Sequence, residues 1–331
     1  MPKAAVIHEM GGPEVFRFED VEVSAPGPGE VRMRHTAIGV NYADTYHRGG
    51  VSHPWPVGEP PVVVGFEATG VVIETGPGVS GFKVGDEVVY GLPPLGAYAQ
   101  ERVYPVSTLL KIPEGIDPVS LAGIFMKGVT AYYLLHMTYE VQPGDWVLVH
   151  AAAGGMGHLL VPWAKFLGAN VVGTVGSEEK GEIAKRLGAD HVVNYRDDDF
   201  AKVCRDLTDG QGVHVVYESI GKDTLTKSLD SLRPLGMCAA YGHASGPPDP
   251  VDIIQDLGAR GSLIITRPAV MHYLATREAL ETAAAGLFEV LGAGVIESAV
   301  NHTYPLSLAA EAHRAIHERR TTGSTVLMPF D

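Results

Sequence analysis

The stretch of this sequence best suited to chemistry is a run of small residues at 151–157, which reads AAAGGMG. It follows an apolar run rich in valine and opens a helical pattern that extends from Met156 to Leu167. Glycine lets the backbone approach a pyrophosphate closely, and the N–H groups at the start of a helix then donate to it. The spacing departs from G-x-G-x-x-G, so this motif alone is also compatible with an ordinary glycine-rich turn. The repeated strand–helix pattern around it favours a dinucleotide-binding loop.

The end of the next apolar run bears on the choice of cofactor. Enzymes that use NAD usually place Asp or Glu there, which accepts from the ribose 2′-hydroxyl. Here residues 173–180 read GTVGSEEK, so the run ends in small residues that leave room for a 2′-phosphate. Ser177 and Lys180 could bind that phosphate, although Lys180 could equally be a solvated lysine. We expect Glu178 and Glu179 to start the following helix, where acidic residues are favoured, and we predict NADPH as the cofactor.

The elements that must position this loop alternate along the middle of the chain. Candidate strands begin every 21 to 25 residues, with a helical pattern between them: 145–150, 170–174, 191–195, 213–218, 237–241 and 262–266. This alternation predicts an α/β fold with a doubly wound, parallel Rossmann sheet over residues 125–268. Residues 1–124 instead contain short β-branched runs separated by Gly and Pro, which predicts a β-rich domain.

The remaining tail reads as a helix at 276–291, a strand at 295–304, a helix at 308–320 and a strand at 324–328. We expect 269–331 to return to the first domain, because an isolated helix and strand need a sheet to complete.

Composition excludes several classes of protein. The 331 residues are 45% hydrophobic and 19% charged, and the net charge of −14 argues against non-specific binding of nucleic acid or anionic membranes. Two cysteines, Cys204 and Cys238, provide neither a disulfide framework nor a multi-cysteine zinc site. No run of about 18 uninterrupted apolar residues predicts a membrane span, and the N-terminus lacks the pattern of a signal peptide. We therefore expect a cytoplasmic protein.

Several segments together carry a resemblance that extends along the whole chain. They are Asn41–Tyr46, Gly65–Gly70, Val84–Asp86, Lys127–Tyr132, Ala151–Gly157, Asn194–Arg196 and Gly261–Pro268. With these segments the chain resembles the quinone oxidoreductases of the zeta-crystallin type, in the zinc-free branch of the medium-chain dehydrogenase/reductase superfamily. The resemblance implies a GroES-like catalytic domain and a Rossmann domain, with the active site in the cleft between them.

The resemblance also implies roles for individual residues. The polar candidates for catalysis are Tyr46, Asn41 and Asp44. The implied cofactor contacts are Asn41, Tyr46 and Thr130 at the nicotinamide; Ala153, Gly154, Gly155 and Met156 at the pyrophosphate; and Gly173, Ser177, Lys180 and Tyr195 around the 2′-phosphate. Along the nicotinamide ribose and the substrate edge it implies Tyr241, Gly242, Ser245, Ile265 and Arg267. Arg320 matches a C-terminal arginine that reaches the cofactor.

Three departures from the family pattern concern the mouth of the substrate site. Ser52 or His53 replaces a family tyrosine, Phe66 stands in a Gly-Phe-Glu segment where the family has Gly-Thr-Glu, and the stretch 55–61 is longer than usual. Zinc relatives have Gly-His-Glu at the same place, and Phe66 cannot ligate a metal. We therefore predict no metal site.

Other histidines do not restore a metal site. We interpret His35, His47 and His53 as surface or core residues. His313 and His317 lie four residues apart among charged neighbours, so we expect them on an exposed helix face.

Without a metal, the acceptor must already be electrophilic. A quinone or conjugated enone meets this requirement, because it takes a hydride from NADPH while water or a modest acid supplies the proton. Tyr46 could donate to the developing oxyanion, or it could simply pack against the nicotinamide. If residues 41–46 form a strand, Asp44 lies on the same side as Tyr46, although a structural hydrogen bond is the more favourable interpretation of Asp44.

We therefore predict an NADPH-dependent, zinc-independent quinone oxidoreductase acting on a small quinone or enone. Two alternatives stay open: a 2-alkenal or enoyl-thioester reductase on the same fold, and a non-enzymatic crystallin-like protein that binds NADPH or RNA. The segment 262–266 is apolar and β-branched, and we place it at the edge of the Rossmann sheet. Since an edge strand offers unpaired backbone groups, we expect a homodimer through this strand.

Overall fold

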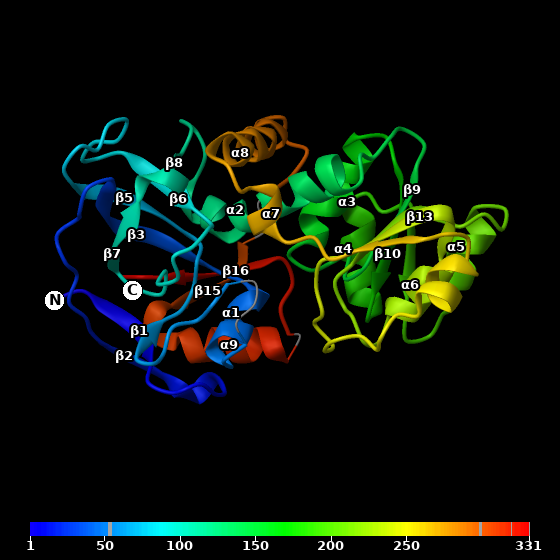
Figure 1. The fold of residues 1–331 in the computed structure, drawn as a ribbon, viewed down its shortest axis with the longest axis horizontal. Coiled ribbons are helices and arrows are strands. Elements are labelled where there is room, and N and C mark those ends of the chain that lie inside the picture. Colours follow the sequence, from blue (N-terminus) through cyan, green and yellow to red (C-terminus); the bar gives the residue numbers. More distant parts are fainter. Residues whose placement is uncertain (52–54, 298–299, 319, 331) are drawn as a thin grey trace. The chain divides into compact units, whose positions relative to one another are not determined.

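The computed structural model describes residues 1–51, 55–297, 300–318 and 320–330 (Figure 1). It divides into two compact units. Unit 1 contains residues 1–126, 276–284 and 298–331, and unit 2 contains residues 127–275 and 285–297. The sequence led us to expect the whole tail from 269 onward in the first domain, but 269–275 and 285–297 belong to unit 2. The segment 285–297 belongs to unit 2 in part because Leu287 packs closely over Gly128 of that unit. A Cβ atom at Gly128 would lie 2.4 Å from the leucine side chain.

Unit 2 is built on a six-stranded parallel sheet in the order β11-β10-β9-β12-β13-β14. The strands are β9 (Trp146–Val149), β10 (Asn170–Val175), β11 (His191–Asn194), β12 (Val213–Glu218), β13 (Leu232–Ala240) and β14 (Ile264–Thr266). This order is that of a doubly wound dinucleotide-binding fold, with the first strand in the middle. The prediction of an α/β Rossmann fold is therefore confirmed, and all six predicted strands are present.

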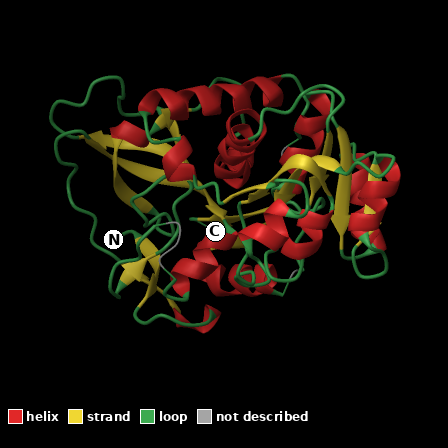
Figure 2. Ribbon diagram, turned by 45° about the vertical axis from the view of Figure 1, so that its right-hand side comes forward, coloured by secondary structure: helices red, strands yellow, loops and turns green. Residues whose placement is uncertain are grey.

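Helices alternate with these strands, as Figure 2 shows in red and yellow. They are α3 (Gly157–Phe166), α4 (Glu178–Arg186), α5 (Phe200–Leu207) and α6 (Leu225–Asp230), and the short α7 (Val270–Tyr273) follows β14. Val147, Leu148 and Val149 in β9 are all fully buried. A parallel strand covered on both faces needs this continuous apolar run, which is why the sequence predicted it well.

Unit 1 contains a seven-stranded sheet and a three-stranded sheet. The strands are β1 (Lys3–Ile7), β2 (Phe16–Asp20), β3 (Glu30–Val40), β4 (Val62–Val63), β5 (Ala68–Thr75), β6 (Glu87–Tyr90), β7 (Glu101–Pro105), β8 (Leu110–Lys111), β15 (Val300–Pro305) and β16 (Ser324–Met328). The long strand β3 pairs antiparallel with β5, β7 and β16. Because Leu327 lies opposite Ile38, the C-terminal strand completes the sheet of the first domain.

The other α-helices of the described residues are α1 (Tyr42–Arg48), α2 (Pro118–Tyr133), α8 (Arg277–Gly292) and α9 (Ala309–His317). Two of the four boundaries between the units fall within helices, at 126/127 in α2 and at 284/285 in α8. Of the strand expected at 295–304, the described residues 295–297 are not in a strand and β15 covers Val300–Pro305, while the helix expected to reach 320 ends at His317. The ends of elements are set by local capping and pairing, which the apolar pattern does not encode.

One described helical stretch, Pro118–Thr138, is long and apolar enough to cross a membrane by length and composition, with a mean hydropathy of 1.2. The sequence argument required an uninterrupted apolar run and therefore overlooked it. Since 67% of its most apolar window is buried within the fold, a role as a core helix accounts for its composition.

Strand β14 forms one edge of the unit 2 sheet, and Ile264 in it is exposed. An apolar edge strand offers unpaired backbone groups to a second copy. We therefore expect a two-fold dimer in which β14 pairs with its symmetry mate. Light scattering at micromolar concentration should give twice the chain mass of 35.2 kDa, and the mass of a single chain would contradict the prediction.

Candidate active site

Helix α1 positions the polar candidates of unit 1, and it begins at a capping box. Asn41 is the N-cap: its backbone N–H donates to Asp44 Oδ2 over 2.9 Å, while its side chain accepts from the backbone of the third helical residue. This reciprocal pair satisfies two N–H groups that a helix start otherwise leaves without a partner. The sequence led us to consider a strand here, and that expectation is wrong because the Asn-x-x-Asp spacing starts a helix.

The two carboxylates beside Asn41 are buried and fix its position. The Asn41 amide donates to Glu67 Oε2 over 2.6 Å, and the backbone N–H of Met126 donates to Glu67 Oε1 over 2.6 Å. Asp44 also accepts a hydrogen bond from the Tyr98 hydroxyl over 3.0 Å. Both carboxylates are fully buried, so they orient Asn41 and the start of α1. This agrees with the structural interpretation of Asp44.

Sequence reasoning missed Glu67 as a functional candidate. The sequence does indicate it: Glu67 is the acidic residue in a run of otherwise apolar and small residues at 62–70. Such a position is typical of a buried carboxylate with specific partners.

Tyr46 lies one turn after Tyr42 on α1, and their rings meet edge to face with centroids 5.4 Å apart. Tyr46 is half-buried, whereas Asp44 is fully buried. Since successive helical residues turn by about 100°, Asp44 and Tyr46 point to opposite sides of α1, not to the same side as a strand would require. Of the three catalytic candidates, Tyr46 is therefore the one with exposed surface for a substrate.

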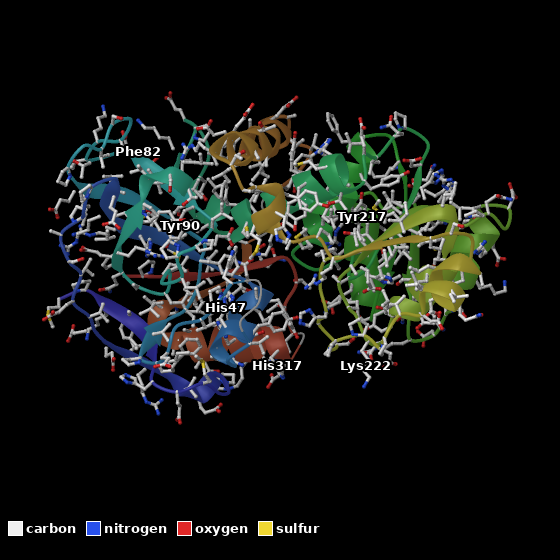
Figure 3. All side chains as sticks on the ribbon, viewed as in Figure 1. His47, Phe82, Tyr90, Tyr217, Lys222 and His317 are labelled. Atoms are coloured by element: carbon white, nitrogen blue, oxygen red, sulfur yellow. The ribbon has the colours of Figure 1, made fainter. Side chains whose placement is uncertain are left out.

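Phe66 is packed in an aromatic cluster. Its ring contacts Trp55 with centroids 4.7 Å apart and His47 with centroids 5.9 Å apart, and all three side chains are buried. His47, labelled in Figure 3, comes from α1, and Trp55 comes from the stretch 55–61. That stretch therefore packs its tryptophan into unit 1. Ser52 and His53, the other departures noted in the sequence, lie outside the described residues.

A second buried network joins α1 to α9. The Arg48 guanidinium lies 3.0 Å from His313 Nδ1, and the Tyr98 hydroxyl lies 2.8 Å from His313 Nε2. His313 is fully buried, so our expectation that it lies on an exposed helix face is wrong. The charged residues around it in sequence lie on other sides of α9, and periodicity alone did not separate them.

Burial lowers the pKa of His313 to about 3, with Arg48 contributing, and burial likewise lowers the pKa of His35 to about 3. In the unfolded chain both histidines titrate near 6.5. Between pH 6.5 and 3 the unfolded state therefore binds more protons than the folded state, and stability falls as the pH falls.

The variant His313→Gln removes one of these two histidines. Between pH 6 and 4 its free energy of unfolding should depend less steeply on pH than that of wild type, and the two slopes should differ by about 1 kcal/mol per pH unit. Denaturant titrations across this range measure the slope. The exposed His8→Gln variant is the control, and equal slopes for wild type and His313→Gln would refute the prediction.

In unit 2, the residues 151–157 form a tight turn between β9 and α3. A Cβ atom at Gly157 would lie 2.2 Å from the Ala152 carbonyl oxygen, and one at Gly173 would lie 2.7 Å from Ala152 Cβ. The backbone thus folds closely against β10, and the N–H groups of residues 158–160 at the start of α3 donate to the carbonyls of Gly154 and Met156. Ala153, Gly154, Gly155 and Met156 belong to this turn, which has the form of a phosphate-binding loop.

The residues expected around a 2′-phosphate lie at the ends of β10 and β11. Ser177 is the N-cap of α4, and its hydroxyl accepts from the backbone N–H of Lys180 over 3.3 Å. Glu178 and Glu179 occupy the first turn, as expected. The Tyr195 hydroxyl would lie 2.9 Å from a Cβ atom at Gly176, so the tyrosine side chain lies close against this glycine. These side chains fit the recognition of an adenosine 2′-phosphate.

The residues expected along the nicotinamide ribose and the substrate edge lie in β14 or directly after β13 and β14, and Thr130, expected at the nicotinamide, lies in α2. Arg267 Nη1 donates to the Ala240 carbonyl over 2.8 Å, and the Ser245 hydroxyl donates to the Ile220 carbonyl over 2.8 Å. The remaining members are Tyr241, Gly242 and Ile265, which are half-buried. Arg320 belongs to unit 1, where it is exposed and pairs with Glu318 over 2.6 Å.

Comparison with known proteins identifies the family. Residues 27–114 match the family described as alcohol dehydrogenase GroES-like domain, and residues 155–301 match the one described as zinc-binding dehydrogenase. A quinone oxidoreductase of Pseudomonas aeruginosa is 43% identical over 99% of this chain and 100% of its own. The chain belongs to the zinc-free quinone oxidoreductases of the medium-chain dehydrogenase/reductase superfamily.

Two further similarities bear on the chemistry of this quinone oxidoreductase family member. A 2-haloacrylate reductase of a Burkholderia species is 59% identical over 99% of both chains. The structure of Escherichia coli quinone oxidoreductase complexed with NADPH has a TM-score of 0.94 and 40% identity, covering 99% of this chain and 100% of that one. The chain is thus an oxidoreductase that acts on a small molecule.

The family name of residues 155–301 mentions zinc, so the metal deserves a direct test. Among the described residues, no group of three or more His, Cys, Asp or Glu side chains is placed to hold a metal ion. Since a catalytic zinc takes three protein ligands, we expect purified protein to contain no stoichiometric zinc and to keep its activity in chelator. Metal analysis of about one zinc per chain, with activity lost on its removal, would contradict this expectation.

Proposed function

We propose that this chain uses NADPH to reduce the carbon–carbon double bond of a small α,β-unsaturated acid such as a 2-haloacrylate. The observation that carries this proposal is the 59% identity to a 2-haloacrylate reductase over 331 residues. The β carbon of such an acid is electrophilic through conjugation, so the reaction needs no metal. Like the quinones and enones that the sequence predicts, such an acid is a conjugated acceptor.

The residues fit the cofactor. The close turn at Gly157 and the start of α3 suit a pyrophosphate, while Ser177, Lys180 and Tyr195 suit a 2′-phosphate. Bound NADPH supplies a hydride from C4 of its nicotinamide. The chain's own contribution is to hold the two reactants together, to exclude bulk water and to stabilise negative charge on the acceptor.

Within unit 1, Tyr46 has the role of donor to the acceptor's carboxylate or carbonyl oxygen. Adding hydride to the β carbon moves an electron pair toward that oxygen, and a phenol hydroxyl placed there lowers the barrier. The proton that completes the α carbon then comes from Tyr46 or from water. Asn41, held by Glu67 and Asp44, fixes the start of the helix that carries Tyr46.

Quinone reduction is the second candidate, and it is favoured by the 43% and 40% identity to quinone oxidoreductases. Initial rates with NADPH, 2-chloroacrylate and 1,4-benzoquinone distinguish the two. The proposal predicts a kcat/KM for 2-chloroacrylate at least 10-fold above that for a non-halogenated quinone. A quinone rate with no turnover of 2-chloroacrylate would replace the proposal by the second candidate.

A further inference from the structure

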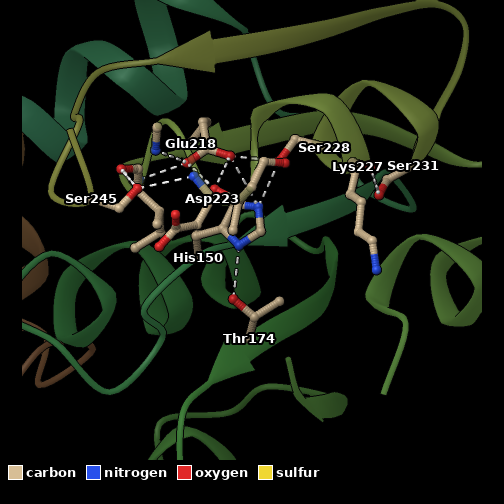
Figure 4. A network of polar contacts seen from close by, with 11 residues as sticks. His150, Thr174, Glu218, Asp223, Lys227, Ser228, Ser231 and Ser245 are labelled. Carbon is tan, nitrogen blue, oxygen red and sulfur yellow. Dashed lines mark hydrogen bonds and ion pairs between the residues drawn. The ribbon is translucent and has the colours of Figure 1, made fainter. Parts of the chain in front are cut away.

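A buried polar network lies under the carboxyl edge of the unit 2 sheet (Figure 4). At its centre is Glu218, the last residue of β12, whose carboxylate is fully buried. One carboxylate oxygen accepts from the backbone N–H groups of Ile220 and Gly221 over 2.6 and 3.1 Å. The Thr224 hydroxyl lies 3.0 and 2.9 Å from the two oxygens, and the Ser228 hydroxyl lies 2.5 Å from the second. Both oxygens of this carboxylate are therefore held by hydrogen bonds from the chain that follows β12.

His150 extends this network to the neighbouring strands. Its Nδ1 lies 2.8 Å from the Thr174 hydroxyl and its Nε2 lies 2.8 Å from the Ser228 hydroxyl. Burial lowers the pKa of His150, so the imidazole is neutral and carries one N–H. One arrangement satisfies every group: Thr174 donates to Nδ1, Nε2 donates to Ser228, and Ser228 donates to Glu218. The network therefore joins the ends of β9, β10 and β12.

This network lies next to the loops on both sides of the central strand, and in this fold those loops hold the two halves of a dinucleotide. In a sheet of this order, the two nucleotide halves lie on either side of the central strand, here β9. On one side, His150 directly precedes the glycine loop, where Ala151 has a φ of +51° and Ala152 N–H donates to the Thr174 carbonyl over 3.0 Å. The adenosine half belongs to this side, which carries β10 and β11.

On the other side, Glu218 shapes the loops after β12 and β13. Its carboxylate holds the N–H groups at 220 and 221, and the Ile220 carbonyl in turn accepts from the backbone and the hydroxyl of Ser245, each over 2.8 Å. A Cβ atom at Gly242 would lie 2.6 Å from the Ser219 carbonyl oxygen, so the two loops are in direct contact. These loops lie at the carboxyl ends of β12 and β13, where the nicotinamide half is held.

We propose that Glu218 is a positioning residue for the nicotinamide half of the cofactor, acting through the loops 219–221 and 241–246. His150 and Ser228 hold that carboxylate in place from the side of β9. Glu218 itself is buried beneath the loops and acts through their backbone. The inference rests on the proposed function only in taking NADPH as the ligand.

The test compares two ligands on the purified full chain. NADPH occupies both halves of the site, whereas 2′,5′-ADP occupies only the adenosine half. For Glu218→Gln we expect the Kd of NADPH to rise by roughly 10- to 100-fold, because the amide's NH₂ group faces buried donors that the carboxylate satisfied. The Kd of 2′,5′-ADP should change by less than about threefold. Fluorescence titration gives both values without any substrate.

Asp190→Asn is the matched control. Asp190 is a paired carboxylate of the same unit that accepts from Val171 N–H at the opposite edge of the sheet, and it pairs with Lys165. For the Asp190→Asn variant, the Kd values of NADPH and of 2′,5′-ADP should both stay within about threefold of wild type. Ser228→Ala removes the link between His150 and Glu218 without adding a donor, and it should shift the two Kd values in the same unequal way. If Glu218→Gln does not fold, the Ser228→Ala variant tests the proposal in its place.

Equal weakening of both ligands, or an unchanged Kd for NADPH in a folded variant, would overturn the role of Glu218. Failure of the wild-type chain to bind NADPH at all would instead overturn the proposed function. Glu218→Asp adds a further check: because it keeps the charge on a shorter side chain, it should restore part of the NADPH affinity.

Discussion

Replacing Tyr46 by phenylalanine should lower kcat by roughly 10- to 1,000-fold, the range for losing one donor to a developing oxyanion. Tyr46 is the half-buried member of the catalytic candidates, and the ring that remains keeps its packing against Tyr42. The affinity for NADPH should change little, because the residues that we expect to contact its phosphates lie in unit 2. Steady-state kinetics with 2-chloroacrylate and with 1,4-benzoquinone measures the effect. The loss should be greater for the less electrophilic acrylate.

Tyr42→Phe is the matched control, since it removes the same hydroxyl from the ring that Tyr46 contacts. It should leave kcat within a few-fold of wild type. An unchanged kcat for Tyr46→Phe with both acceptors would make Tyr46 a packing residue and leave water as the source of the proton.

Replacing Lys180 by alanine should weaken NADPH binding by about 1.5–3 kcal/mol, the scale of one charge-assisted hydrogen bond, which corresponds to roughly 10- to 150-fold in Kd. Lys180 lies in the first turn of α4, next to the N-cap Ser177. Binding of NADH, which lacks the 2′-phosphate, should barely change.

Lys185→Ala serves as the control for this experiment. Lys185 lies in the last turn of the same helix and pairs with Glu182, so its loss should affect neither cofactor. Equal losses of NADPH and NADH affinity in Lys180→Ala would show that Lys180 does not recognise the 2′-phosphate.

The features that the sequence predicted well are those that depend on chain-local patterns. Runs such as 147–149 are buried on both faces and must be apolar throughout, so strands and helices could be separated by period and length. The glycine loop was recognisable for a similar reason: only glycine fits where a Cβ atom would lie 2.2 Å from a carbonyl oxygen.

The features that the sequence did not predict depend on contacts between distant residues. The helix at 42–48 starts because Asp44 caps it, yet the same carboxylate also accepts from Tyr98, 54 positions away. His313 is buried where its two ring nitrogens contact Arg48 and Tyr98. The sequence of its own helix does not indicate these distant partners. The contacts of Glu67 and Glu218 likewise appear only once the strands are assembled.

The most direct test of the account is to follow the hydride itself. NADPH deuterated at C4, prepared as each epimer, is incubated with 2-chloroacrylate and the chain, and the product is examined by NMR. The account predicts 2-chloropropionate carrying one deuterium at C3 with one of the two epimers, and hydrogen from water at C2. Product without deuterium at C3 from either epimer, or no product while NADPH reduces benzoquinone, would contradict it.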